Sequence, residues 1–129
     1  MGMESFHVLV ADDLRSMRNV IKSILRNIGF ATIYDAEDGQ QSLHLLRNET
    51  IHLVVCDWNM PKMTGLELLE AMRADSQLAD IPFIMVTAEN SKERITQAIQ
   101  AGTDEYVVKP FNEETLRKKI ANALRRHSS

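Results

Sequence analysis

The chain has 129 residues, 44% of them hydrophobic, which is typical of a single compact domain with its own core. Its 15 basic and 18 acidic residues give a formal net charge of −3. This argues against a dedicated nucleic-acid binder, because such proteins usually carry a strong basic excess. The single cysteine, Cys56, excludes a disulfide within the chain and fits a reducing compartment.

The sequence shows no signal for export or membrane insertion. The segment Met1-Gly2-Met3-Glu4 has neither the basic region nor the apolar stretch of a signal peptide. No run approaches the roughly 18 apolar residues that would span a bilayer. We therefore expect a cytoplasmic protein without a membrane segment.

Two hydrophobic patterns alternate five times along the chain. Short apolar runs, typical of strands, lie at residues 8–10, 31–34, 53–56, 83–86 and 106–108. Those beginning at residues 8, 53 and 83 show little alternation, as expected of parallel strands covered on both faces. Each run is followed by a segment with helical periodicity. The clearest extends from Met17 to Ile28 and ends at Gly29.

The other four helices are indicated by apolar spacing and capping residues. Leu43 and Leu46 mark the second helix, and Leu66, Leu69 and Met72 mark the third, after the capping box Thr64-x-x-Glu67. Ile95, Ala98 and Ile99 mark the fourth, before Gly102, and Leu116, Ile120, Ala123 and Leu124 mark the fifth, after the N-cap Asn112. Five strand–helix units predict an open, doubly wound α/β sheet with parallel strands and helices on both faces. Five strands are too few for a closed eight-stranded barrel. We predict a single domain over residues 1–129.

Polar residues that could belong to a site come just after four of the five predicted strands, whereas Asp35, after the second, carries no comparable signal. They are Asp12 and Asp13, Asp57, Thr87, and Lys109. Open α/β sheets bind ligands beyond the carboxyl ends of their strands, so these residues should meet at one edge. Each of these residues alone is weak evidence for a functional site, because an Asp pair is often a helix-capping turn and Thr87 could cap the fourth helix. Their joint placement indicates a site.

Three converging carboxylates repel one another unless a cation joins them. Oxygen ligands without histidine or thiolate favour Mg2+. A carboxylate beside Mg2+ can act as a nucleophile toward phosphorus and form an acyl phosphate. Lys109 and Thr87 can supply the cation and the hydroxyl donor that the developing charge requires.

Four stretches resemble the receiver domains of two-component response regulators, and within them the CheY-like chemotaxis regulators: Val10-Ala11-Asp12-Asp13, Cys56-Asp57-Trp58-Asn59-Met60-Pro61, Val86-Thr87-Ala88-Glu89 and Tyr106-Val107-Val108-Lys109-Pro110-Phe111. The resemblance covers the chain essentially end to end. It implies a flavodoxin-like sheet with strand order 2-1-3-4-5 and five helices, the order known from flavodoxin and CheY.

The resemblance also assigns roles within the acidic site. Asp57 is the expected phosphoacceptor, and Asp12 and Asp13 are the expected Mg2+ carboxylates together with Asp57. Asn59 would add its backbone carbonyl to the metal ligands. Lys109 would pair with the phosphoryl oxygens, and its bond to the following proline is expected to be cis.

Further roles concern the output of the domain. Thr87 and Tyr106 are the expected switch residues, and Asn59 and Glu89 the residues that tune loss of the phosphoryl group. The positions that would contact a flagellar switch protein are Lys92, Ile95, Tyr106, Val108, Phe111 and Lys119. Asn90, Ile99, Thr103 and Asn122 differ from the enterobacterial pattern, so the partner is less well defined than the site.

The expected function is that of a signalling switch rather than an enzyme. A chemotaxis-type histidine kinase would phosphorylate Asp57, and the active form would bind the flagellar motor switch; a phosphatase is a further candidate partner. We expect a monomer that binds no nucleic acid. The sequence ends about one helix after Lys109, so we expect no DNA-binding effector. The alternative is a stand-alone receiver that passes its phosphoryl group to a histidine phosphotransfer domain.

Two other classes fit less well. A haloacid-dehalogenase-type phosphatase has a second aspartate two residues after its nucleophile, whereas this chain has Asn59, which cannot act as that general acid. A flavin-binding module would have to place its phosphate in an aspartate-rich loop that repels it. Gly39 and Gly65 are interpreted as turn glycines rather than as part of a phosphate-binding loop.

Overall fold

The computed structural model describes residues 3–127. A short 3-10 helix, Met3–Ser5, precedes a regular alternation of strands and α-helices. The elements of this part of the chain are β1 (His7–Ala11), α1 (Arg15–Ile28), β2 (Thr32–Ala36), α2 (Gly39–Asn48), β3 (Leu53–Cys56), α3 (Gly65–Ala74), β4 (Phe83–Thr87), α4 (Lys92–Ala101), β5 (Glu105–Val108) and α5 (Glu113–Arg126).

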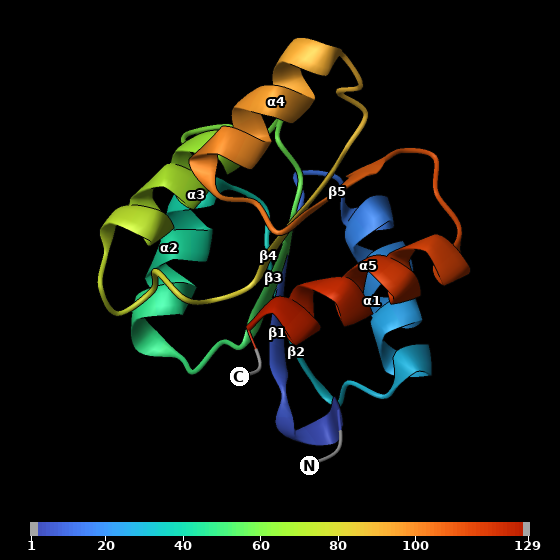
Figure 1. Cartoon of the computed structure of the whole chain (residues 1–129). Helices are drawn as coiled ribbons and strands as arrows, with labels where there is room; N and C mark the ends of the chain where they lie inside the picture. Colours follow the sequence, from blue (N-terminus) through green and yellow to red (C-terminus); the bar gives the residue numbers. More distant parts are fainter. Residues whose placement is uncertain (1–2, 128–129) are drawn as a thin grey trace.

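Within the described residues the strands form one parallel sheet in the order β2-β1-β3-β4-β5, which confirms the predicted flavodoxin-like topology. Helices α1 and α5 cover one face of the sheet, and α2, α3 and α4 cover the other (Figure 1). In the register of the sheet, Ala11 is level with both Ala36 and Cys56, and Thr87 is level with Val108. The residues that follow β1, β3 and β5 therefore emerge at the same end of the sheet.

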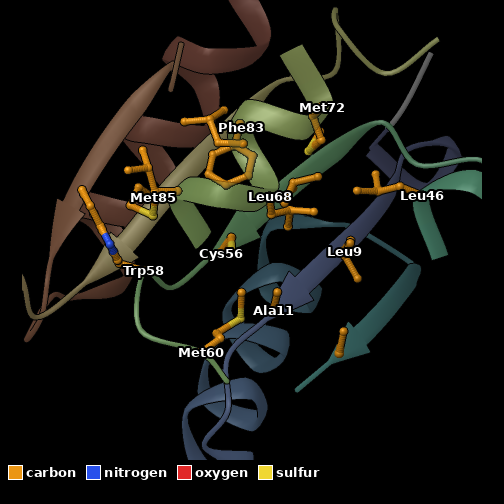
Figure 2. Packing of buried hydrophobic residues seen from close by; sticks show 14 of the residues in the cluster. Leu9, Ala11, Leu46, Cys56, Trp58, Met60, Leu68, Met72, Phe83 and Met85 are labelled. Carbon is orange, nitrogen blue, oxygen red and sulfur yellow. The ribbon is translucent and has the colours of Figure 1, made fainter. Parts of the chain in front are cut away.

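The sheet separates two hydrophobic clusters because alternate side chains of a strand point to opposite faces. Leu9 and Val54 pack toward α2, α3 and α4, whereas Val8 and Val10 pack toward α1 and α5. Figure 2 shows the first cluster, in which Phe83 lies among side chains from β3 and α3. The central strands are buried on both faces, and this explains their continuous apolar runs.

Helix starts follow the expected capping chemistry in two cases and differ in one. The capping box before α3 is present, and Asn112 caps α5. Helix α4 is capped by Ser91, so the interpretation of Thr87 as its cap is wrong. Of the helices in the described part of the chain, none has the length and apolar character needed to cross a bilayer.

Gly39 and Gly65 are not turn glycines but the first residues of α2 and α3. A Cβ at Gly65 would lie 2.1 Å from the carbonyl oxygen of Asp57, and one at Gly39 would lie 2.3 Å from that of Met63. Gly65 also donates its N–H to the carbonyl of Trp58 at 2.8 Å. Glycine is required at position 65 because α3 begins directly against the backbone of the loop after β3.

Replacing Gly65 by alanine should lower the free energy of unfolding by about 1–3 kcal/mol, because the new methyl group must displace the backbone at Asp57. Urea unfolding followed by circular dichroism measures the change. Ser23→Ala, at an exposed position of α1, is the control and should change stability by less than about 0.5 kcal/mol. Equal stability of Gly65→Ala and the parent protein would contradict the close approach.

Candidate functional site

The sheet brings the predicted polar residues together at its carboxyl edge. Asp12 and Asp13 follow β1, Asp57 follows β3, and Lys109 follows β5. Asp12, Asp13 and Asp57 each offer a carboxylate oxygen, and these oxygens lie within 4.8 Å of one another. Asp12 is fully buried and Asp57 is 8% exposed, whereas Asp13 faces solvent. The site is therefore an acidic pocket that opens to solvent on the side of Asp13.

Lys109 is the cation of this pocket. Its Nζ lies 2.8 Å from Asp12 Oδ2 and 3.1 Å from Asp57 Oδ2. Burial disfavours the charged lysine, but hydrogen bonds and charges from Asp12 and Asp57 outweigh burial and raise the pKa of Lys109. Burial raises the pKa of Asp12 despite its bonds to Lys109 and to the backbone of Leu14. The peptide bond between Lys109 and Pro110 is cis, as expected.

The Asp57 carboxylate is fixed in orientation by its neighbours. Its Oδ1 accepts hydrogen bonds from the backbone N–H groups of Trp58 at 2.6 Å and Asn59 at 3.4 Å. Its Oδ2 accepts from Lys109. One oxygen is thus held by the backbone and the other by a cation, an arrangement that suits a carboxylate that must attack in one direction.

Thr87 and Tyr106 are connected through Glu89. Thr87 is fully buried, and its hydroxyl accepts a hydrogen bond from the backbone N–H of Glu89 at 3.3 Å. The Tyr106 hydroxyl donates to the backbone carbonyl of Glu89 at 2.6 Å. Burial, and then the negative charges of Glu89 and Asp57, raise the pKa of Tyr106 to about 12. Three of the predicted residues therefore form one hydrogen-bonded chain from the site to β5.

The Asn59 amide donates to Glu89 Oε2 at 3.0 Å, which joins the two residues expected to tune loss of the phosphoryl group. Their side chains link the loop after β3 to the loop after β4. The structure therefore brings these two residues into direct contact.

Sequence reasoning missed an ion pair beneath the acidic pocket. Arg18, nine-tenths buried, donates to the backbone carbonyl of Asp12 at 2.8 Å and to Asp35 Oδ2 at 3.0 Å. Lys22 also pairs with Asp35, at 3.3 Å. The one signal in the sequence was the position of the charged Arg18 within the apolar stripe of α1, but this stripe does not indicate which residue Arg18 pairs with.

The comparisons with known proteins agree on the family. The sequence model of the response regulator receiver domain family matches residues 8–121. The chain belongs to this family. It is 44% identical over 119 residues to the chemotaxis protein CheY of Pseudomonas aeruginosa, covering 92% of this chain and 96% of that protein. It is 41% identical over 123 residues to CheY-3 of Vibrio cholerae, covering 95% of each.

Solved structures extend this likeness to three dimensions. The structure of the chemotaxis protein CheY4 of Vibrio cholerae superposes with a TM-score of 0.84 at 34% identity, over 92% of this chain and 98% of that one. A CheY-like receiver domain from Methanospirillum hungatei gives a TM-score of 0.85 at 30% identity, over 95% of each chain. This receiver domain is therefore CheY-like in sequence and in fold, and its family implies signalling that depends on phosphorylation.

The receiver domain gathers most of the residues expected to contact a partner. Ile95, Tyr106, Val108 and Lys119 line one groove of about 410 Å³ between α4, β5 and α5. Phe111 lines an adjoining hollow of about 320 Å³ together with Tyr106, Val108 and Lys119. Lys92 lies apart, in a shallow hollow with other residues of α4. Five of the six expected residues thus share one continuous surface.

A larger cavity, of about 640 Å³, lies elsewhere. Phe6, Ile51 and Pro82, at the amino ends of the strands, line it together with Leu124 of α5. It contains none of the predicted site residues. This cavity is therefore separate from the acidic site of the receiver domain.

Mg2+ should quench or shift the fluorescence of Trp58, the single tryptophan, because its backbone N–H bonds to the Asp57 carboxylate. Asp13→Asn should remove or greatly weaken the effect while leaving the fold intact, since Asp13 is exposed. Asp80→Asn is the matched control, because Asp80 is exposed and lies just before β4, at the opposite end of the sheet. This variant should titrate like the parent. An unchanged titration in Asp13→Asn would refute the metal assignment.

Proposed function

We propose that the protein accepts a phosphoryl group from a chemotaxis-type histidine kinase on Asp57, with Mg2+ beside it, and that the phosphorylated form binds the flagellar motor switch. The observation that carries the proposal is the contact of Lys109 with both Asp12 and Asp57 in a pocket of three carboxylates. The CheY relatives support the chemotaxis assignment. A phosphatase is a further candidate partner.

The pocket suits a divalent cation that prefers oxygen ligands. Three carboxylates converge there, and only one lysine ammonium, among the described residues, bonds to two of them. Neither histidine nor thiolate belongs to the set of donors, which favours Mg2+ over zinc or copper. Asp12, Asp13, Asp57 and the backbone carbonyl of Asn59 would hold the ion. When bound, Mg2+ would neutralise the converging charge and orient the phosphoryl oxygens.

The transfer is a substitution at phosphorus. An Asp57 oxygen bonds to phosphorus while the bond from phosphorus to the histidine nitrogen of the kinase breaks, and the electron pair stays with that nitrogen. The Lys109 ammonium, already within hydrogen-bonding distance of Asp57, would then pair with a phosphoryl oxygen. The Thr87 hydroxyl would donate to another. The domain promotes only its own phosphorylation and dephosphorylation.

Signalling would begin at Thr87. If its hydroxyl turns toward the phosphoryl group, it gives up the hydrogen bond from the Glu89 N–H. Tyr106 bonds to the carbonyl of the same Glu89, so a shift of Glu89 would favour one orientation of the tyrosine. The groove between α4 and α5, which Tyr106 lines, would then change shape.

Asn59 and Glu89 would set the lifetime of the acyl phosphate. Asn59 is two residues after the acceptor, and Glu89 two residues after Thr87. Their side chains are hydrogen-bonded to each other, and their backbone N–H groups bond to Asp57 and to Thr87, respectively. The partner surface would comprise Lys92, Ile95, Tyr106, Val108, Phe111 and Lys119.

Acetyl phosphate should label the protein on Asp57 alone and only when Mg2+ is present. Asp57→Asn should abolish labelling, because the amide is not a nucleophile toward phosphorus. Phos-tag electrophoresis or mass spectrometry of the intact protein measures it, with Asp80→Asn as a control that should label normally. Labelling that survives in Asp57→Asn would falsify the choice of acceptor.

Beryllofluoride, which mimics a phosphoryl group on a carboxylate, should make the protein bind an N-terminal peptide of a flagellar switch protein more tightly. Ile95→Ala should weaken that binding by about five-fold or more, because it removes an apolar contact from the groove. Gln40→Ala, at an exposed position of α2 that lines neither this groove nor the hollow around Lys92, should not. Fluorescence anisotropy of a labelled peptide provides the measurement. Equal affinity with and without beryllofluoride would favour the role of phosphorelay intermediate instead.

A further inference from the structure

Four side chains form a closed ring beside Asp57. Asn59 Nδ2 donates to Glu89 Oε2 at 3.0 Å, and Arg94 Nε lies 3.8 Å from Glu89 Oε1. The Arg94 guanidinium carbon also lies 5.1 Å from the centre of the Trp58 ring, in cation–π contact. Trp58 and Asn59 are consecutive residues, so the peptide bond between them closes the ring of contacts.

The ring connects three separate parts of the chain. Trp58 and Asn59 belong to the loop after β3, Glu89 belongs to the loop after β4, and Arg94 lies in the first turn of α4. The backbone N–H of Arg94 donates to the side chain of Ser91, which caps this helix. The guanidinium is therefore carried by a capped helical turn, and from there it contacts both loops.

Both carboxylate oxygens of Glu89 are engaged by the ring. Oε2 accepts from Asn59, and Oε1 pairs with Arg94. The backbone of Asn59 in turn bonds to Asp57, and the backbone of Glu89 bonds to Thr87. The Glu89 carboxylate thus lies between the two loops that flank the acceptor. An engaged carboxylate is a poor acceptor for the proton of an attacking water, whereas a released one can orient that water and take its proton.

We propose that Arg94 is a positioning residue that keeps the Glu89 carboxylate bound to Asn59 and thereby slows hydrolysis of the phosphoryl group on Asp57. This inference rests on the proposed function, because Asp57 must carry the acyl phosphate. In the hydrolysis, a water oxygen bonds to phosphorus while the bond from phosphorus to the Asp57 oxygen breaks, and the electron pair returns to the carboxylate. Inorganic phosphate leaves, and one proton of the water passes to solvent.

The effect should be moderate. The side chains of Arg94 and Glu89 are 48% and 35% exposed, so solvent screens their attraction. An exposed ion pair and a cation–π contact of this kind together correspond to a change of about two- to five-fold in a rate constant. The guanidinium carbon lies over the ring of Trp58, a residue that is itself only 4% exposed, and this contact limits the orientations open to Arg94.

The test compares rates of dephosphorylation in five proteins: the parent, Arg94→Ala, Arg94→Lys, Glu89→Gln and the double variant Arg94→Ala/Glu89→Gln. Each protein is labelled with acetyl phosphate, freed of the donor, and followed by the decay of the phosphorylated species in the presence of Mg2+. Arg94→Ala should hydrolyse about two- to five-fold faster than the parent. Arg94→Lys, which keeps the positive charge but not the planar group, should fall between the two.

The double variant decides whether Arg94 acts through Glu89. If it does, Arg94→Ala should change the rate little in the Glu89→Gln background, because no carboxylate remains to be released. Arg47→Ala, which removes an exposed arginine from α2, is the matched control and should decay like the parent. Urea unfolding of every variant checks that a faster decay is not the result of a loosened fold.

The outcomes separate this inference from the proposed function. Equal decay rates in the parent and Arg94→Ala would overturn the role of Arg94 while the phosphorylation of Asp57 stands. If Arg94→Ala accelerates hydrolysis as much in the Glu89→Gln background as in the parent protein, the proposal that Arg94 acts through Glu89 is overturned. Failure of the parent to take up label on Asp57 would overturn the proposed function and this inference with it.

Discussion

The ammonium group of Lys109 lies between Asp12 and Asp57, 2.8 and 3.1 Å from their oxygens, and these contacts balance charge that the fold itself creates. Strands β1 and β3 run in register so that Ala11 is level with Cys56, and an aspartate follows each. Such a convergence costs free energy unless a counter-charge is present. The loops around the pocket are therefore arranged to hold the lysine, the carboxylates and a site for a further cation.

The order and type of the main elements could be predicted from the sequence, because β1, β3 and β4 are covered on both faces and carry continuous apolar runs. It was less accurate at β2, which was predicted over residues 31–34 and extends over Thr32–Ala36. That strand lies at the edge of the sheet and is only half-buried, so its pattern includes the charged Asp35. Where burial is incomplete, hydrophobicity no longer marks the end of a strand.

The acidic pocket could be predicted for a simple reason: its residues lie directly after strands, and parallel strands all end at the same edge. The residues that support the pocket could not. Arg18 bonds to the carbonyl of Asp12, and Gly65 allows α3 to begin against the carbonyl of Asp57. Arg94 contacts Trp58 and Glu89. These contacts depend on how helices pack against loops, and no spacing in the sequence encodes them.

Glu89 shows how such contacts link separate properties of one site. Its carboxylate bonds to Asn59, beside the acceptor, whereas its backbone bonds to both Thr87 and Tyr106. A residue held in this way cannot shift its backbone without straining its side-chain contacts, since only a few rotatable bonds separate the two. A change that favours one orientation of Tyr106 would therefore also act on the Thr87 hydroxyl, because the backbone of Glu89 bonds to both. Under the proposed function, the lifetime of the phosphoryl group and the shape of the output surface would therefore both depend on the position of the loop that contains Glu89.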